Sequence, residues 1–224
     1  MKYFKIYGIH RTGTNYISAL LMKNFNVKVF MNVGGCKHCH FIQYPDESNL
    51  LNSVDNNTKR NTPVEFTLEL FQKELVYFIV MIKNPYMWIR SIAEFEKKLI
   101  TPNYVIQKIQ TWNDTYMNYK EYIMNGTAYL IKYEQLLKNR EQTIQKIIDN
   151  FHLSQKYPSI IDINYKLGPN CDSDIERTLP IRFDKSMYID CKITNYLSTD
   201  IIRIINNTID KSLLDFYQYD MIDI

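Results

Sequence analysis

Near the start of the chain, residues 6–16 read Ile6-Tyr7-Gly8-Ile9-His10-Arg11-Thr12-Gly13-Thr14-Asn15-Tyr16. A hydrophobic run over residues 3–7 leads into this stretch, and apolar residues then recur at helical spacing over about residues 15–24. A strand, a glycine-bounded loop and a helix N-terminus form a concave anion site, because the loop amides and the positive end of the helix dipole point at one place. The stretch therefore predicts a phosphate-binding loop.

The loop departs from the commonest loop of this kind in its charged residues. Gly8 and Gly13 have the separation of the two glycines in a Walker A loop, G-x-x-x-x-G-K-[ST]. Thr14 and Asn15 stand where the Lys and the Ser/Thr should follow, and the cation comes earlier, as Arg11. The missing pair serves a nucleoside triphosphate and Mg²⁺. The departure therefore argues against that partner and favours a single charged leaving group.

The rest of the chain alternates between strand and helix patterns. Further strands are predicted over residues 27–31, 75–83 and 128–131, and helices over residues 65–74, 85–99, 103–124, 133–151, 199–210 and 213–217. Residues 75–83 are almost unbroken hydrophobic sequence, as in a parallel strand buried on both faces. The pattern breaks down over residues 155–196. We expect an α/β fold: a three-layer P-loop-type domain with a central parallel β-sheet flanked by helices.

Length and composition limit the class of protein further. With 224 residues, of which 46% are hydrophobic, the chain is expected to form a single domain over residues 1–224. A net charge of +3 is too small to argue for nucleic acid, although it suits an anionic ligand. The longest strongly apolar run, residues 75–82, is too short to cross a membrane. Without a visible signal peptide, a cytoplasmic protein with four reduced cysteines is expected.

A second loop follows the buried strand at residues 75–83. Lys83 stands just past that strand, Pro85 suits the first turn of a helix, and Ser91 comes eight residues after Lys83. Both side chains could converge on one phosphate, with Lys supplying charge and Ser a short donor. Both loops end parallel strands, and ligands in such sheets bind beyond the carboxyl ends of the strands.

These landmarks resemble those of the sulfotransferases that use 3′-phosphoadenosine 5′-phosphosulfate (PAPS). The first loop, residues 11–15, is similar to their phosphosulfate loop, and Lys83 with Ser91 resembles their 3′-phosphate motif. Residues 133–136 are similar to a Tyr-Glu-Asp-Leu element that follows a short strand in many members, and residues 217–220 resemble their tail. The resemblance lies in ordered landmarks spread over most of the chain.

The resemblance implies transfer of a sulfuryl group from PAPS to a hydroxyl or amine, giving 3′,5′-ADP (PAP) and a sulfated product, with no metal required. Arg11 would neutralise the leaving 5′-phosphate, and Lys83 and Ser91 would hold the 3′-phosphate. Lys83 stands where the family more commonly has Arg, which keeps the charge and loses the bidentate fork. The 5′-phosphate would be held by the amides of residues 12–15 and by two of their side chains: Thr12, Gly13, Thr14 and Asn15 supply the amides, Thr14 and Asn15 the side chains.

Other interpretations compete with this one. The runner-up is an ATP-dependent P-loop kinase or phosphotransferase, and a third is a non-catalytic nucleotide-binding module with the same fold. The first loop could also be an ordinary strand-to-helix turn, and Lys83 and Ser91 a solvated Lys and a surface Ser. The acceptor is expected to be a small molecule, glycan or peptide, with no nucleic-acid or membrane partner.

Residues 36–40, Cys36-Lys37-His38-Cys39-His40, support three interpretations. C-x-x-C-H matches c-type haem attachment, which the absence of an export signal disfavours. Cys36 and Cys39 could bind zinc with His40, or with Cys171 and Cys191, although the spacing fits no compact finger. The third interpretation rests on the resemblance, because many sulfotransferases carry their base in the loop after the second strand. A neutral His suits proton removal, so His38 is the predicted catalytic base, with His40 and then Glu65 as alternatives.

The remaining charged and aromatic residues receive weaker predictions. Arg177, Arg182 and Lys185 lie where family members close over the cofactor with basic residues, but a solvated charged loop is the preferred interpretation. Trp88 and Trp112 are expected to pack in or near the core.

Overall fold

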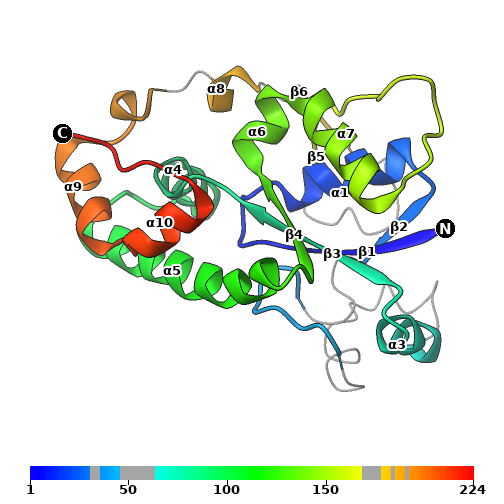
Figure 1. Cartoon of the computed structure of the whole chain (residues 1–224). Coiled ribbons are helices and arrows are strands. Elements are labelled where there is room, and N and C mark those ends of the chain that lie inside the picture. The colour runs from blue at the N-terminus through cyan, green and yellow to red at the C-terminus, as the bar shows by residue number, and fades with distance from the viewer. Residues whose placement is uncertain (31–35, 46–63, 168–177, 183–184, 190–191) are drawn as a thin grey trace.

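The computed structural model describes residues 1–30, 36–45, 64–167, 178–182, 185–189 and 192–224. Its centre is a parallel four-stranded sheet in the order β2-β1-β3-β4 (Figure 1). The strands are β1 (Lys2–Tyr7), β2 (Val27–Phe30), β3 (Val76–Ile82) and β4 (Ala128–Lys132). In register, Tyr7 lies opposite Val80, and Val80 lies opposite Leu130. The predicted α/β fold with a central parallel sheet is confirmed.

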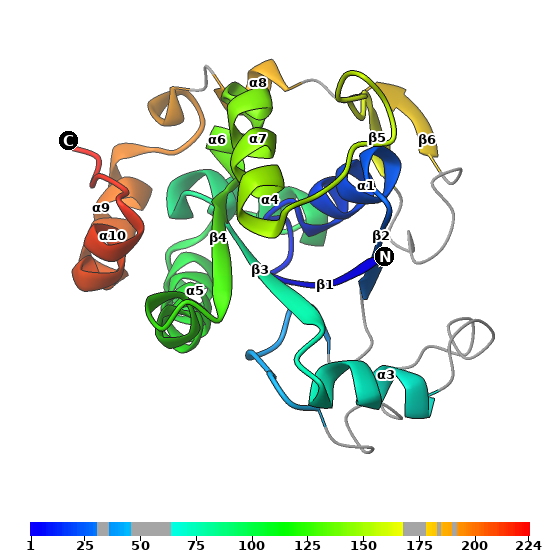
Figure 2. The same cartoon turned by 45° about the vertical axis from the view of Figure 1, so that its right-hand side comes forward.

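Helices cover both faces of this sheet, which explains why β3 is hydrophobic along its whole length. Its alternate residues enter two separate cores, with Val80 and Ile82 in one and Ile79 and Met81 in the other. One face carries α1 (Thr14–Asn24), α6 (Tyr133–Lys138) and α7 (Arg140–Phe151). The other carries α3 (Val64–Gln72), α4 (Pro85–Glu96), α5 (Pro102–Met124), α9 (Thr199–Thr208) and α10 (Lys211–Tyr217), as Figures 1 and 2 show.

Local signals set the ends of the helices. The α4 helix begins at Pro85 after Asn84, whose side chain accepts from the amides of Tyr86 and Met87. It ends at Glu96 rather than near residue 99, because Lys97 takes a left-handed conformation (φ 54°). Ser198 caps α9 by accepting from the amide of Ile201.

Short elements appear where the sequence pattern breaks down. The β5 (Tyr165–Leu167) and β6 (Thr178–Arg182) strands pair antiparallel, and α8 (Ser186–Ile189) and the 3₁₀ helix Ile193–Asn195 follow. The ring of Tyr188 on α8 packs edge-on against Tyr133, at 5.6 Å between centroids. None of these elements is long enough to give a periodic signal, so the sequence did not predict them.

Within the part of the chain that the structure describes, no helix has both the length and the apolar character needed to span a bilayer.

Candidate functional site

The loop between β1 and α1 is shaped by close packing and unusual backbone angles. Gly13 has φ +90°, and a Cβ on it would lie 2.3 Å from Cδ2 of Tyr133. A Cβ on Gly8 would lie 2.7 Å from the Met81 carbonyl oxygen of the neighbouring strand. Arg11 adopts a left-handed conformation with φ 70°, which is costly for a residue that is not Gly and occurs most at functional sites. The loop is therefore held in one shape by the fold around it.

This loop leads from the carboxyl end of β1 into the N-terminus of α1. Gly13 is the N-cap and offers no side chain, and the first amides of a helix lie ahead of its backbone hydrogen-bond ladder. The buried Thr12 is committed to the loop instead, since its Oγ1 donates to the Ile9 carbonyl at 2.7 Å and its amide to the same oxygen at 3.4 Å. The amides that we predict to bind an anion therefore begin at Gly13 rather than at Thr12.

Lys37 reaches this helix N-terminus from the segment after β2. Its side chain is only 6% exposed, and its Nζ donates to Oδ1 of Asn15 at 2.7 Å. Its carbonyl accepts the Gly8 amide at 3.0 Å, which fastens the segment to the start of the loop. The sequence placed Lys37 between two cysteines but assigned it no role. The ammonium group adds a second cation to the loop that already carries Arg11.

His38 lies against the same loop. Its Nδ1 is 2.6 Å from the carbonyl oxygen of Gly8, and because a carbonyl only accepts, Nδ1 carries the proton and Nε2 is left with a free lone pair. The pKa of His38 is lowered to about 3, chiefly by burial and also by nearby His10 and Lys37, against the hydrogen bond to Gly8. The His38 imidazole is therefore neutral, as a catalytic base must be, but it is a weaker base than an ordinary histidine.

His10 is a second imidazole at the site, and the sequence analysis did not consider it. Its ring centroid lies 3.8 Å from that of His38, and its carbonyl accepts from Nε1 of Trp88 at 2.7 Å. The His10 ring also stacks with the ring of Phe95 on α4. The Arg11 guanidinium lies 5.4 Å from the centroid of the same Phe95 ring. Burial lowers the pKa of His10, and Lys37 lowers it further. The sequence signal that could have identified His10 as a site residue is its position next to Arg11 in the loop.

Lys83 stands at the end of β3 in an aromatic setting. Its side chain is 1% exposed, and its Nζ lies 4.4 Å from the ring centroid of Tyr188 and 5.0 Å from that of Tyr133. Burial lowers its pKa to about 7, while the Glu134 carboxylate acts in the opposite direction. The same Tyr133 ring closes over Gly13 of the first loop. One ring therefore forms the wall between the two predicted phosphate sites.

Two charged residues in the second and third turns of α4 also act on the Lys83 ammonium. Arg90 and Glu94, which flank the buried Ser91, both act electrostatically on Lys83, as does Arg11 of the first loop. The fold thus brings together the two loops that the sequence singled out separately. The binding roles of Arg11, Lys83 and Ser91 stay predictions.

Glu134 fixes the backbone next to Lys83. Its Oε1 accepts the amide of Asn84 at 2.8 Å, and its Oε2 accepts the hydroxyl of Tyr219 at 3.0 Å. The Tyr133–Glu134 element and the C-terminal segment therefore meet at the second loop. Both segments resemble family landmarks in the sequence, but the sequence did not predict that they meet.

The other candidates from the sequence lie elsewhere or outside the described residues. His40 is exposed, and Glu65 is the second residue of α3, with its side chain outside the described part of the structure. Cys36 and Cys39 are free thiols, and no cluster of three His, Cys, Asp or Glu residues suited to a metal occurs among the residues described. Cys171, Cys191, Arg177 and the side chain of Arg182 fall outside them. Lys185 is paired with Asp162 rather than solvated. Trp88 and Trp112 are buried, as predicted.

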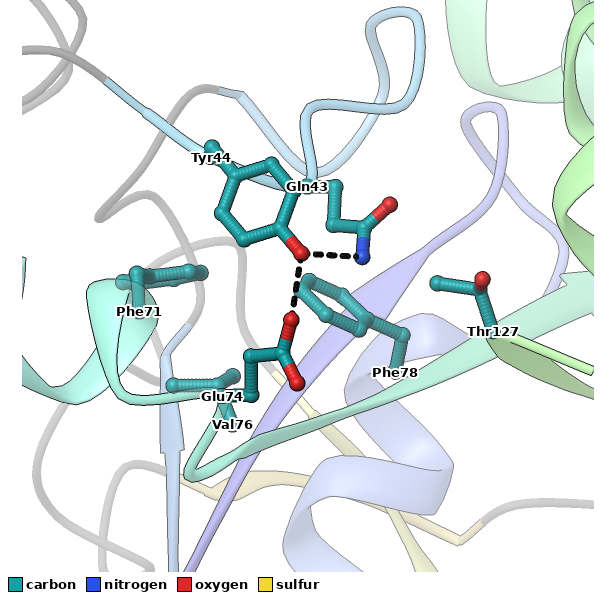
Figure 3. A pocket seen from close by; sticks show the side chains of 7 residues that line it. All are labelled: Gln43, Tyr44, Phe71, Glu74, Val76, Phe78 and Thr127. Carbon is teal, nitrogen blue, oxygen red and sulfur yellow. Dashed lines mark hydrogen bonds between the residues drawn. The ribbon is translucent and has the colours of Figure 1, made fainter.

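A cavity of about 230 Å³ lies at the opposite end of the sheet (Figure 3). Val76 begins β3, and Thr127 precedes β4, so this cavity opens at the amino ends of the strands. The hydroxyl of Tyr44 donates to Glu74 across its mouth at 2.6 Å. The cavity is separate from the two loops that are predicted to bind phosphate, which follow the carboxyl ends of β1 and β3. It is lined by Gln43, Tyr44, Phe71, Glu74, Val76, Phe78 and Thr127.

Comparisons of the whole chain with known proteins give a structural match alone. No protein-family model matches the sequence, and no curated protein does. A crystal structure of mouse sulfotransferase SULT7A1 complexed with PAP superimposes with a TM-score of 0.59 at 12% identity, covering 97% of this chain and 89% of that one. A sulfotransferase domain from the Synechococcus PCC 7002 olefin synthase aligns with a TM-score of 0.42 at 12% identity, over 100% of this chain and 89% of that one. The chain therefore shares its fold with the mouse sulfotransferase.

Proposed function

We propose that this protein transfers a sulfuryl group from PAPS to a hydroxyl or amine, releasing PAP and a sulfated product. The observation that carries the proposal is the convergence of two phosphate loops on one aromatic wall. Tyr133 touches Gly13 at the first loop and lies 5.0 Å from the Lys83 ammonium at the second. A ligand with phosphates on both the 3′ and 5′ positions meets both loops at once, whereas a nucleoside triphosphate needs one loop and a Mg²⁺ site.

The residues present suit the two phosphates of such a ligand. The first amides of α1 and the Arg11 guanidinium would hold the 5′-phosphate, where charge develops on the leaving oxygen. The buried Lys83 ammonium and the Ser91 hydroxyl would hold the 3′-phosphate. Lys37, beside Asn15, would place a further cation near the transferred group. PAPS supplies the activated sulfuryl group, and the protein contributes position and charge.

His38 would take the proton of the acceptor. Its Nε2 carries the lone pair because Nδ1 is directed at Gly8. A bound anion beside the ring favours the protonated form, which raises the low pKa of His38 toward the range of an effective base. The acceptor oxygen or nitrogen then bonds to sulfur while the bond from sulfur to the 5′-phosphate breaks.

The structural comparison supports the choice of ligand. The mouse sulfotransferase that shares this fold was crystallised with PAP. Both phosphates of PAP have a counterpart in the loops described above. We further propose a small-molecule, glycan or peptide acceptor for this chain.

Ligand-dependent thermal stability tests the proposal against its rivals. PAP and PAPS should raise the melting temperature of the protein, and ATP with or without Mg²⁺ should raise it less. A response to ATP–Mg²⁺ equal to that of PAP would reject sulfuryl transfer and favour a kinase. Stabilisation by PAP without transfer from labelled PAPS to any member of a broad acceptor panel would favour a non-catalytic binding module.

A further inference from the structure

Two thiols flank the residues that the proposed mechanism uses. Cys36 and Cys39 stand immediately before and after Lys37 and His38. The amide of Cys39 donates to the carbonyl of Cys36 at 3.1 Å, which makes residues 36–39 a hydrogen-bonded β-turn. Both cysteines are free and exposed. The turn that presents Lys37 and His38 is thus closed at both ends by a cysteine.

The turn brings the two cysteines close together. The amide of Cys39 meets the carbonyl of Cys36, and Cys36 is one of the groups that raise the pKa of the Cys39 thiol. A β-turn keeps its first and fourth Cα atoms within about 7 Å, and disulfides span Cα separations of roughly 4.4–6.8 Å. A covalent bond between these cysteines therefore requires only a local adjustment of the turn.

The surroundings of the two thiols differ in a way that gives each a role. Sγ of Cys36 accepts the amide of His38 at 3.4 Å, and an N–H donor stabilises a thiolate. Cys39 has its pKa raised by burial and by the neighbouring Cys36, with the buried Lys5 ammonium acting in the opposite direction. Cys36 is therefore the thiol that attacks first, and Cys39 the one that resolves the product.

We propose that Cys36 and Cys39 form a reversible intramolecular disulfide by exchange with a low-molecular-weight disulfide, and that this bond slows group transfer at the adjacent site. The Cys36 thiolate attacks the disulfide RSSR, forming a mixed disulfide and releasing one RS⁻. The Cys39 thiolate then attacks Cys36 Sγ and releases the second. Two protein thiols are oxidised, one disulfide is reduced, and their two protons end on the two RSH products.

The effect on transfer follows from what the turn holds. Bonding shortens the sulfur separation to about 2.05 Å and removes the thiol that now accepts the His38 amide. The displaced residues include Lys37, whose Nζ meets Asn15, and His38, whose ring meets Gly8. Displacement of a catalytic group by about 1 Å can cost 10²-fold in rate. The predicted slowing of transfer rests on the proposed function, whereas formation of the disulfide does not.

The experiment equilibrates the full chain in buffers of reduced and oxidised glutathione. Mass spectrometry of the peptide that contains Cys36 and Cys39 reads the disulfide as the loss of two hydrogens. Turnover with PAPS should fall by about tenfold or more as the disulfide forms, and dithiothreitol should restore it. PAP binding should change less, because Lys83, Arg11 and the α1 amides lie outside the turn.

Two sets of variants separate this disulfide from other thiol chemistry. The C36S/C39S double variant should keep one turnover value across all the buffers. The C171S/C191S double variant should respond as the unmodified chain does. Free thiols or mixed glutathione disulfides at residues 36 and 39 throughout the series would overturn the proposal, as would an intramolecular disulfide with unchanged turnover. If the disulfide forms but the reduced protein neither binds PAP nor uses PAPS, the modification site stands and the proposed function fails.

Discussion

Glu134 accepts the amide of Asn84, the residue after Lys83, at 2.8 Å, and its negative charge opposes the effect of burial on the Lys83 ammonium. Arg11, Glu94 and Arg90 are the other charged groups that act on this ammonium. The rings of Tyr133 and Tyr188 exclude water from it. The charge that would bind a phosphate is therefore favoured by two carboxylates, Glu134 more than Glu94, beside two aromatic rings.

The first prediction concerns pH. The pKa of Lys83 is lowered to about 7, chiefly by burial, so its charge is present below pH 7 and is lost above it. PAP affinity, measured by calorimetry, should weaken as pH rises from about 6 to 8. E134Q should lower the pKa of Lys83 further and move this decline to lower pH. The unfolded chain holds the Lys83 proton longer than the folded one, so Lys83 itself makes ligand-free stability rise with pH above 7.

The matched control for that variant is E141Q, which removes an exposed carboxylate on α7. Its PAP-binding profile should follow that of the unmodified protein. Identical profiles for E134Q and E141Q would show that Glu134 does not govern the charge on Lys83.

The second prediction concerns Lys83, the residue proposed to bind the 3′-phosphate. Lys83→Ala should weaken PAP binding by about ten- to hundredfold, because a hydrogen bond to a charged group contributes about 1.5–3 kcal/mol. Lys83→Arg should recover part of this loss by restoring the charge. The control is Lys98→Ala, beyond the exposed end of α4, which should bind PAP normally. Equal affinity of the two alanine variants would remove Lys83 from the site.

The third prediction concerns the base. His38→Ala should lower turnover by about 10²–10⁴-fold, with PAP affinity nearly unchanged, because the phosphates are held by other groups. His40→Ala, on the exposed next turn, is the matched control and should turn over normally. Steady-state kinetics with PAPS would measure both, and normal turnover in the His38 variant would exclude it as the base.

The fourth prediction compares two glycines with positive φ. Gly13→Ala places a Cβ 2.3 Å from Tyr133 at φ +90°, whereas Gly126→Ala, at φ +78°, meets no atom within 4 Å. Gly126→Ala should cost about 1–2 kcal/mol, from the backbone conformation alone. Gly13→Ala should cost about 1–3 kcal/mol more through overpacking against the ring. Chemical denaturation measures both, and equal losses would show that Tyr133 moves aside without penalty.

The sheet and its helices were predictable because their signals are local. The continuous hydrophobic run of β3 requires cover on both faces, and Asn84-Pro85 marks the start of α4. The two loops that we predict to bind phosphate could be singled out because each follows such a strand. Parallel pairing then puts them on the same edge.

Lys37 could not be assigned from the sequence because a tertiary contact places it at the site. The contact of Lys37 with Asn15 spans 22 residues of chain. It depends on how residues 36–45 cross the sheet, with the Cys39 carbonyl accepting from Tyr119 and the Phe41 amide donating to Asn118, both on α5. Nothing in the local pattern of residues 36–40 encodes those partners.

The parallel register of β1 and β3 gives the site a fixed span. Tyr7 and Val80 are paired neighbours, so the loops that follow the two strands keep one separation set by backbone hydrogen bonds. Under the proposed function, this separation selects ligands by the distance between their two phosphates. A 2′,5′-bisphosphate isomer carries the same charge as PAP, but its phosphates are a different distance apart, so only one of them can reach its loop.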